Sequence, residues 1–204
     1  MSSSSALQGL LNHPGIWRAG SKKATGAHMV IDWPPLDEVL PGGGWPLGVL
    51  TEILSDHAGC GEVGLLLPAL SRLSQGGRWV AWVAPPHIPY APALAAQGLD
   101  LARVLIVRPR TPEEILWAAE QLLNSRATGA VVAWVKSADD RRLRRLQLAA
   151  ESNTALAVLF RSGGDATKNS PAALRLKVEP GGRGPKVQVM KCRGRAPSQP
   201  LYIT

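Results

Sequence analysis

The sequence predicts an α/β protein with a mainly parallel sheet and helices on both faces of that sheet. Short apolar segments, of the length of buried strands, alternate with longer segments whose apolar residues recur at helical spacing. A helix between two strands returns the chain to the same edge of the sheet, so the two strands run parallel. The 204 residues, 45% of them hydrophobic, suffice for one domain with its own core.

The elements of this sheet follow one another from residue 49 onward. Apolar strands are expected at residues 49–54, 79–84, 104–107, 130–135 and 155–160. The connecting helices are expected at residues 63–74, 92–97, 112–126 and 141–152. Thr111 can cap the third helix, and Glu113 and Glu114 suit its first turn. An antiparallel hairpin that extends the sheet is expected at residues 173–178 and 186–192.

The segments before the first of these strands are expected to be irregular. Residues 1–28 are rich in Ser, Gly and basic residues and predict a flexible N-terminal arm, with a short helix around residues 6–12. Residues 42–46, Gly-Gly-Gly-Trp-Pro, predict a turn, because three glycines and a proline do not favour a regular element. The expected organisation is therefore an arm at 1–28 and a folded core domain at 29–204.

Cysteine content and hydropathy indicate the compartment. Cys60 and Cys192 are too few for a four-ligand zinc site, and in a reducing compartment they are not expected to form a disulfide. The longest apolar run, residues 63–73, falls short of the roughly 20 residues that a membrane span needs. The first residues lack the basic and apolar regions of a secretory signal. We therefore expect a cytoplasmic protein that binds no metal and does not enter a membrane.

The net charge of +8 is concentrated in the last third of the chain. Residues 1–135 carry nine basic and ten acidic side chains, whereas residues 136–204 carry fourteen basic and five acidic ones. This asymmetry is typical of a surface that binds nucleic acid or an acidic protein, although solvated surfaces can show it too. The candidate binding residues are Arg141, Arg142, Arg144, Arg145, Arg161, Lys168, Lys191, Arg193 and Arg195.

Tryptophan is unusually frequent, with seven residues against one phenylalanine. Three fall in predicted core strands, namely Trp79, Trp82 and Trp134, and Trp117 on a predicted helix is also a candidate for packing. Trp17, Trp33 and Trp45 precede the first strand, where they serve either as exposed anchors for a partner or as packing at the edge of the core.

The segment after the first expected strand has the layout of a phosphate-binding loop. In such loops, backbone N–H groups hold phosphate, a lysine reaches the outer phosphates and a Ser or Thr binds Mg²⁺. Here the loop offers Ser55, Gly59 and Gly61. Glu62 or Gly61 stands at the lysine position, and Val63 has no oxygen for Mg²⁺. Because a carboxylate repels a triphosphate, we expect a degenerate nucleotide site.

Motifs in the same order resemble the core of the RecA recombinase family. Residues 36–53, L-D-E-V-L-P-G-G-G-W-P-L-G-V-L-T-E-I, resemble the segment that leads into the RecA phosphate loop. Residues 151–156, E-S-N-T-A-L, and residues 187–193, V-Q-V-M-K-C-R, resemble two later RecA segments. The resemblance covers about residues 30–204 and implies a RecA-like three-layer core with a C-terminal hairpin.

The same resemblance implies that the chemistry of ATP hydrolysis is lost. Pro86 stands where RecA proteins have a catalytic glutamate, and Trp134 stands near the position of an aspartate linked to Mg²⁺. Proline cannot activate water and tryptophan cannot hold Mg²⁺. Together with Glu62, three positions argue against a residual ATPase, so we expect no enzyme and no cofactor.

Among RecA-like proteins without ATPase residues, the chain most resembles the ImuA family of translesion DNA synthesis. That resemblance implies a non-catalytic adaptor in the SOS response to DNA damage. Its partner would be ImuB, an inactive Y-family polymerase homologue, with RecA or weakly and non-specifically bound DNA as further partners. The chain also resembles, more loosely, the SulA family. This alternative implies an SOS inhibitor of cell division that binds the tubulin-like protein FtsZ.

Overall fold

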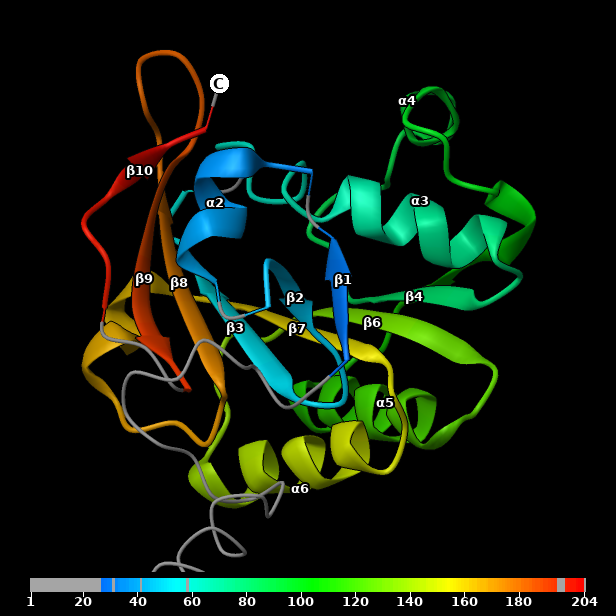
Figure 1. Cartoon of the computed structure of the whole chain (residues 1–204). Helices are drawn as coiled ribbons and strands as arrows, with labels where there is room; N and C mark the ends of the chain where they lie inside the picture. The colour runs from blue at the N-terminus through cyan, green and yellow to red at the C-terminus, as the bar shows by residue number, and fades with distance from the viewer. Residues whose placement is uncertain (1–26, 31, 41, 58, 194–196, 204) are drawn as a thin grey trace, which may run out of the picture.

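The computed structural model describes residues 27–30, 32–40, 42–57, 59–193 and 197–203. Most of the expected arm, together with Trp17 and Arg195, lies outside these residues. The described chain forms a large mixed sheet from β3 (Leu50–Leu54), β4 (Trp79–Val83), β5 (Val104–Val107), β6 (Thr128–Trp134), β7 (Leu156–Arg161), β8 (Leu174–Glu179), β9 (Lys186–Cys192) and β10 (Leu201–Tyr202). The strands lie in the order β10-β9-β8-β3-β7-β6-β4-β5 (Figure 1).

The sheet is mainly parallel, as the alternation of strands and helices predicts. Six neighbouring strands run parallel to one another, in the spatial order β8-β3-β7-β6-β4-β5. β9 and β10 run antiparallel at one edge. The expected C-terminal hairpin is confirmed as β8 and β9, and it extends the sheet because β8 also pairs with β3.

Helices cover both faces of this sheet, so the expected three layers are present. On one face lie α2 (Pro34–Val39), α3 (Leu67–Gln75) and α4 (Ala91–Ala96), and on the other lie α5 (Pro112–Asn124) and α6 (Asp140–Glu151) (Figure 1). A separate cluster of buried residues fills each interface. Alternate residues of β7 divide between the two clusters, with Val158 in the first and Leu159 in the second.

The predicted turn at residues 42–46 is wrong in its second half. β2 (Gly44–Pro46) pairs antiparallel with β1 (His28–Val30) to form a small second sheet. Gly44 makes this pairing possible, because a Cβ at this position would collide with the carbonyl oxygen of Met29. The absence of a side chain, which counted against a regular element, is what lets the two backbones approach.

The helix predicted from residue 63 begins at Leu67 instead. Pro68 lies in its first turn, where a residue without an N–H group is tolerated. Residues 62–66 form successive turns, including a hydrogen bond from the N–H group of Leu66 to the carbonyl oxygen of Val63 at 3.0 Å. The loop after β3 is therefore longer than the sequence predicts.

Other local expectations have mixed outcomes. The capping box of α5 is confirmed, since Thr111 Oγ1 accepts the N–H of Glu114 and the Glu114 carboxylate accepts the N–H of Thr111, each at 3.2 Å. Trp45 is fully buried and is not an exposed anchor, whereas Trp117, expected to pack, is 62% exposed.

None of the helices in the described part of the chain has the length and apolar character needed to cross a bilayer.

Candidate functional site

A cleft of about 680 Å³ lies at the carboxyl edge of the parallel strands. Its lining residues come from the loops that follow β3, β4, β5, β6 and β7, which is where ligands bind in open α/β sheets. Four of the positions predicted for the degenerate nucleotide site line this cleft: Ser55, Glu62, Pro86 and Trp134. Positions spread over eighty residues of sequence thus meet at one site because their strands are parallel neighbours.

The loop after β3 satisfies one of its own amides with a carboxylate. Gly59 donates its N–H to Glu62 Oε1 at 2.9 Å. In a phosphate-binding loop such amides point to phosphate oxygens. Gly59 and Gly61 have φ values of +81° and +93°, a region that favours glycine, so the tight turn depends on both. The loop therefore folds around the Glu62 side chain.

Glu62 adds negative charge to the interior of the cleft. The residue is only 5% exposed, and its Oε2 has no hydrogen-bond partner among the described residues. Burial raises the pKa of the adjacent Cys60 thiol, and the Glu62 carboxylate raises it further. The Cys60 thiol is therefore kept protonated, which does not suit it to act as a nucleophile.

Asp56 places a second carboxylate at the cleft. Its Oδ1 accepts hydrogen bonds from Ser162 Oγ at 2.8 Å and from the N–H of Gly163 at 2.9 Å. The Ser162 hydroxyl is the main cause that lowers the pKa of Asp56 below its usual value, and the Gly163 amide adds to it. Asp56 thus remains ionised and links the loop after β3 to the loop after β7.

Two aromatic side chains, Trp134 and Phe160, also line the cleft. Trp134 stacks on Phe160 with ring centroids 4.9 Å apart, and Trp82 lies 5.6 Å from Trp134. Trp134 therefore belongs to a cluster of three aromatic side chains. Arg110 and Lys136 are exposed lining residues of the same cleft. In the described chain, no three His, Cys, Asp or Glu side chains gather as metal ligands.

A buried ionic network lies under the loop after β7, and sequence reasoning missed it. Glu52 in β3 accepts from Arg161 Nη1 at 2.6 Å, from Arg175 Nε at 2.7 Å and from Ser170 Oγ at 2.9 Å. Arg161 Nη2 also pairs with Asp165 Oδ2 at 2.9 Å. The prediction that Arg161 contacts a partner is wrong, because its side chain is buried within this network.

The network fixes the segment η2 (Gly163–Thr167), which follows β7. Arg175 donates to the carbonyl oxygens of Asp165 at 2.8 Å and Lys168 at 2.9 Å. Lys168 is exposed but pairs with Asp165 at 2.6 Å. A detectable signal was an acidic residue, Glu52, within a predicted buried strand that otherwise contains only Thr51 and apolar residues. A buried carboxylate needs cations nearby.

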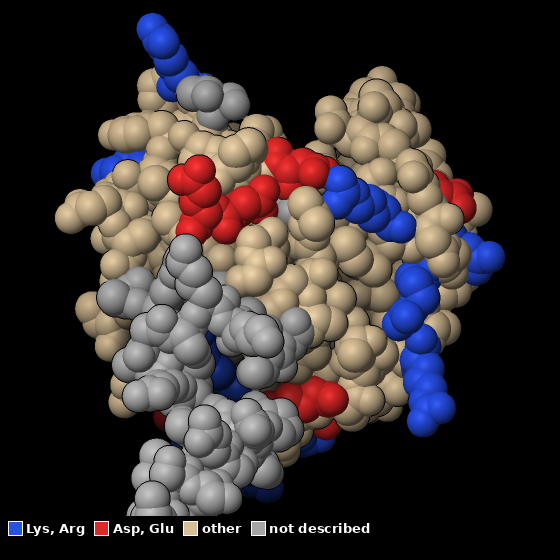
Figure 2. Space-filling model, viewed as in Figure 1, with Lys and Arg blue, Asp and Glu red and all other residues tan. Residues whose placement is uncertain are grey.

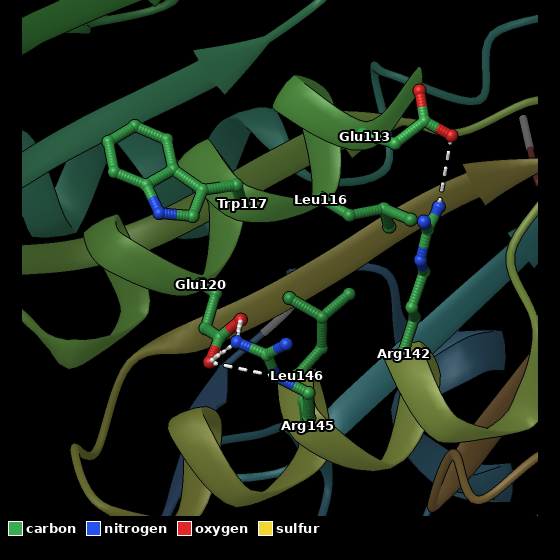
Figure 3. Close-up of a pocket in the computed structure, with 7 residues that line it drawn as sticks. All are labelled: Glu113, Leu116, Trp117, Glu120, Arg142, Arg145 and Leu146. Atoms are coloured by element: carbon green, nitrogen blue, oxygen red, sulfur yellow. Dashed lines mark hydrogen bonds and ion pairs between the residues drawn. The ribbon is translucent and has the colours of Figure 1, made fainter. Parts of the chain in front are cut away.

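The predicted arginines of α6 divide into two groups. Arg142 pairs with Glu113 at 3.3 Å and Arg145 pairs with Glu120 at 2.8 Å, so both hold α6 against α5. The four paired side chains line a pocket of about 210 Å³, and Trp117 lines it too. Figure 3 shows Leu116 and Leu146 between the two ion pairs, with the indole of Trp117 extending away from the Glu113–Arg142 pair.

The remaining predicted cations are exposed. Arg141 and Arg144 have no carboxylate partner among the described residues. Lys191 donates to the carbonyl oxygen of Ser170 at 2.8 Å, and partial burial lowers the pKa of its ammonium group. Arg193 is exposed at the end of β9. Acidic side chains gather on the face shown in Figure 2, around the position of α2 in Figure 1. Asp32, which precedes α2 in the chain, pairs with Arg72.

The fold and the cleft together define a class: a mixed α/β protein whose sheet carries carboxylates and aromatic rings at the edge where ligands bind. Within that class, the chain belongs to the SulA family. The family model described as cell division inhibitor SulA matches residues 48–157, which is more than half of the chain. The match begins just before β3, ends within β7 and leaves out β1, β2 and β8 to β10.

Individual proteins give similar results. The cell division inhibitor SulA of Yersinia pestis (strain Pestoides F) is 29% identical over 114 residues, which are 56% of this chain and 68% of that protein. SulA of Edwardsiella piscicida is 29% identical over 96 residues, covering 47% of this chain and 57% of that protein. The crystal structure of SulA from Pseudomonas aeruginosa is 27% identical, covers 55% of this chain and 98% of that chain, and gives a TM-score of 0.46.

Proposed function

We propose that this protein is a non-catalytic inhibitor of cell division that acts in the bacterial SOS response by binding FtsZ in the cytoplasm. The observation that carries the proposal is the SulA family match over residues 48–157. The similar proteins from Yersinia and Edwardsiella are named cell division inhibitors. The matched segment includes β3 to β6 and helices α3 to α6, so the likeness extends over most of a folded sheet and not only over a short motif.

The chemistry of the cleft supports the non-catalytic part of this proposal. The Glu62 carboxylate accepts the Gly59 amide that a phosphate would otherwise use. Ionised Asp56 adds a second negative charge, so a triphosphate entering the cleft would meet electrostatic repulsion. We take the cleft to be a RecA-like nucleotide site that has become degenerate and binds neither ATP nor another cofactor.

FtsZ assembly in the presence of GTP tests the main function. With this protein at equal concentration, the fraction of FtsZ that sediments as polymer should fall, and the two proteins should elute together from a gel-filtration column. Phosphate release by this protein alone is the control, because hydrolysis of GTP would by itself reduce assembly. Unchanged sedimentation without co-elution would refute the proposal.

A second function, an adaptor in translesion synthesis, is favoured by one observation. Residues 158–204 lie beyond the SulA match, yet β8 and β9 complete the sheet and bring exposed Lys168, Lys191 and Arg193 with them. Co-purification with ImuB or RecA but not with FtsZ would establish this alternative. Titration of labelled single-stranded DNA at low and moderate salt tests the nucleic-acid part, since phosphate contacts weaken as salt rises.

A further inference from the structure

The outer edge of β5 is open. β5 is the last strand of the eight-stranded sheet, and among the described strands it pairs with β4 alone. Leu105 and Ile106 are 39% and 37% exposed, and as neighbours in a strand they point to opposite faces. Both faces of β5 are thus accessible at this edge. Proteins usually protect such edges with charged residues within the strand, and the sequence Val-Leu-Ile-Val contains none.

One further exposed apolar side chain adjoins this edge. Leu101 belongs to η1 (Leu101–Arg103), which leads directly into β5, and it is 41% exposed. Single exposed apolar residues are ordinary, but Leu101, Leu105 and Ile106 belong to one continuous segment, and such a group is typical of a surface that binds a protein.

Both ends of β5 are basic. Arg103 precedes the strand, and its guanidinium group lies 5.5 Å from the centroid of the Trp79 ring at the start of β4. Arg108 and Arg110 follow the strand and are exposed. Within the described residues, none of these three arginines has a carboxylate partner. An apolar edge strand is therefore flanked by cations that are available for pairing.

This charge pattern argues against a second copy of the chain as the occupant. Antiparallel pairing of two β5 strands would bring Arg103 of each copy toward Arg108 of the other, and like charges opposite one another destabilise a strand pair. A segment with carboxylates at its ends has the complementary charge. We propose that β5 accepts an added strand from a partner protein, and that this strand is a short apolar segment flanked by Asp or Glu. The identity of the partner as FtsZ rests on the function proposed above.

A synthetic peptide tests this surface without any partner protein. The probe is a capped peptide of alternating Val and Thr with two Asp at each end, and the matched peptide carries Lys in place of Asp. The Asp peptide should bind at least about tenfold more tightly by fluorescence anisotropy, and the difference should shrink as salt is added. The double variant Arg103→Glu/Arg108→Glu should reverse the preference. Equal binding of the two peptides would overturn the proposal.

Substitutions separate this edge from other exposed apolar residues. Leu105→Lys should weaken binding of the Asp peptide, because a lysine on an edge strand opposes strand addition. The matched control is Leu148→Lys, since Leu148 is a 63% exposed leucine on α6, on the far side of the sheet. Urea denaturation of both variants shows whether each remains folded. Equal loss of binding in two folded variants would contradict a specific role for β5.

Hydrogen exchange with FtsZ distinguishes the failure of this inference from the failure of the proposed function. FtsZ should slow exchange at residues 104–107. FtsZ binding without slower exchange there would overturn the inference and leave the proposed function standing. If FtsZ does not bind but the Asp peptide does, the proposed function is refuted, whereas the inference that β5 accepts an added strand is retained. Slow exchange at 104–107 in a dimer of this chain alone would show that a second copy is the occupant and would refute the inference.

Discussion

The substitution Glu52→Gln should destabilise the protein strongly. Glu52 is fully buried in β3, and its two oxygens pair with Arg161 and Arg175 at 2.6 and 2.7 Å. The change keeps the size and shape of the side chain but removes the negative charge between two buried guanidinium groups. The loss of stability therefore arises mainly from the uncompensated positive charge of the two arginines. Because Gln fills the same space as Glu, the substitution leaves no cavity that would add to this loss.

The size of this loss of stability depends on the partners that Arg161 and Arg175 keep in the variant. Removing one member of a buried ion pair typically costs about 3–5 kcal/mol. Arg161 keeps its pair with Asp165, and Arg175 keeps its bonds to the carbonyl oxygens of Asp165 and Lys168. We therefore expect the free energy of unfolding to fall by about 3 kcal/mol, the lower end of this range. Domains are stable by about 5–15 kcal/mol, so this is a large fraction of the total. The melting temperature should fall by roughly 6–12 °C.

Urea denaturation followed by circular dichroism measures this loss. The matched control is Glu120→Gln, which removes the carboxylate of the exposed pair with Arg145 and should cost about 0–1 kcal/mol. Arg161 and Arg175 keep their bonds to residues 163–170 in the Glu52 variant, but they lose the buried carboxylate that anchors them to β3. This segment should therefore open more often, and its proteolysis should accelerate in the Glu52 variant only. Equal stability losses in the two variants would show that the buried network does not stabilise the fold as argued.

Four further outcomes follow from the site and its surroundings. Glu62→Lys should increase affinity for inorganic triphosphate in calorimetry, and unchanged affinity would show that charge is not what excludes phosphate. Asp56 has a lowered pKa in the folded state, so its contribution to stability is present above its ordinary pKa of 3.8 and is lost as pH falls below it. The urea midpoint of Asp56→Asn should therefore vary less than that of the wild type at acidic pH. Thr111→Ala should cost about 1 kcal/mol through loss of the capping box of α5, measured by urea denaturation. Trp117→Ala should change stability by less than about 0.5 kcal/mol, because the side chain is exposed, and should reduce acrylamide quenching of the remaining fluorescence.

Most elements of the fold could be predicted because each strand and helix has its own periodicity. The strands at 104–107 and 186–192 agree with the sequence-based ranges to the residue. The errors occurred where a neighbour decides the conformation. Gly44 forms a strand only because β1 lies against it, and no local pattern of residues 42–46 contains that partner. Tertiary contact overrides local preference at such positions.

The position of the cleft could also be predicted, whereas its internal bonds could not. Parallel strands end at one edge of a sheet, so residues that follow different strands, such as Ser55 and Pro86, are expected to meet there. The hydrogen bond from Gly59 to Glu62 depends on the left-handed backbone of the loop. The sequence shows that this loop contains a carboxylate, but only the folded loop shows that the carboxylate accepts the Gly59 amide.

The uneven charge of the sequence has a structural explanation that weakens its use as a sign of nucleic-acid binding. Several basic residues of the last third pair with acids from the first part of the chain, as Arg161 does with Glu52 and Arg145 with Glu120. Part of the cation excess after residue 135 is thus paired with individual carboxylates from before it. Arg103 and Arg108 beside β5 lie before residue 135, and neither has a carboxylate partner in the part of the chain that the structure describes. Binding of an acidic partner is therefore better sought at the β5 edge than across the last third of the chain as a whole.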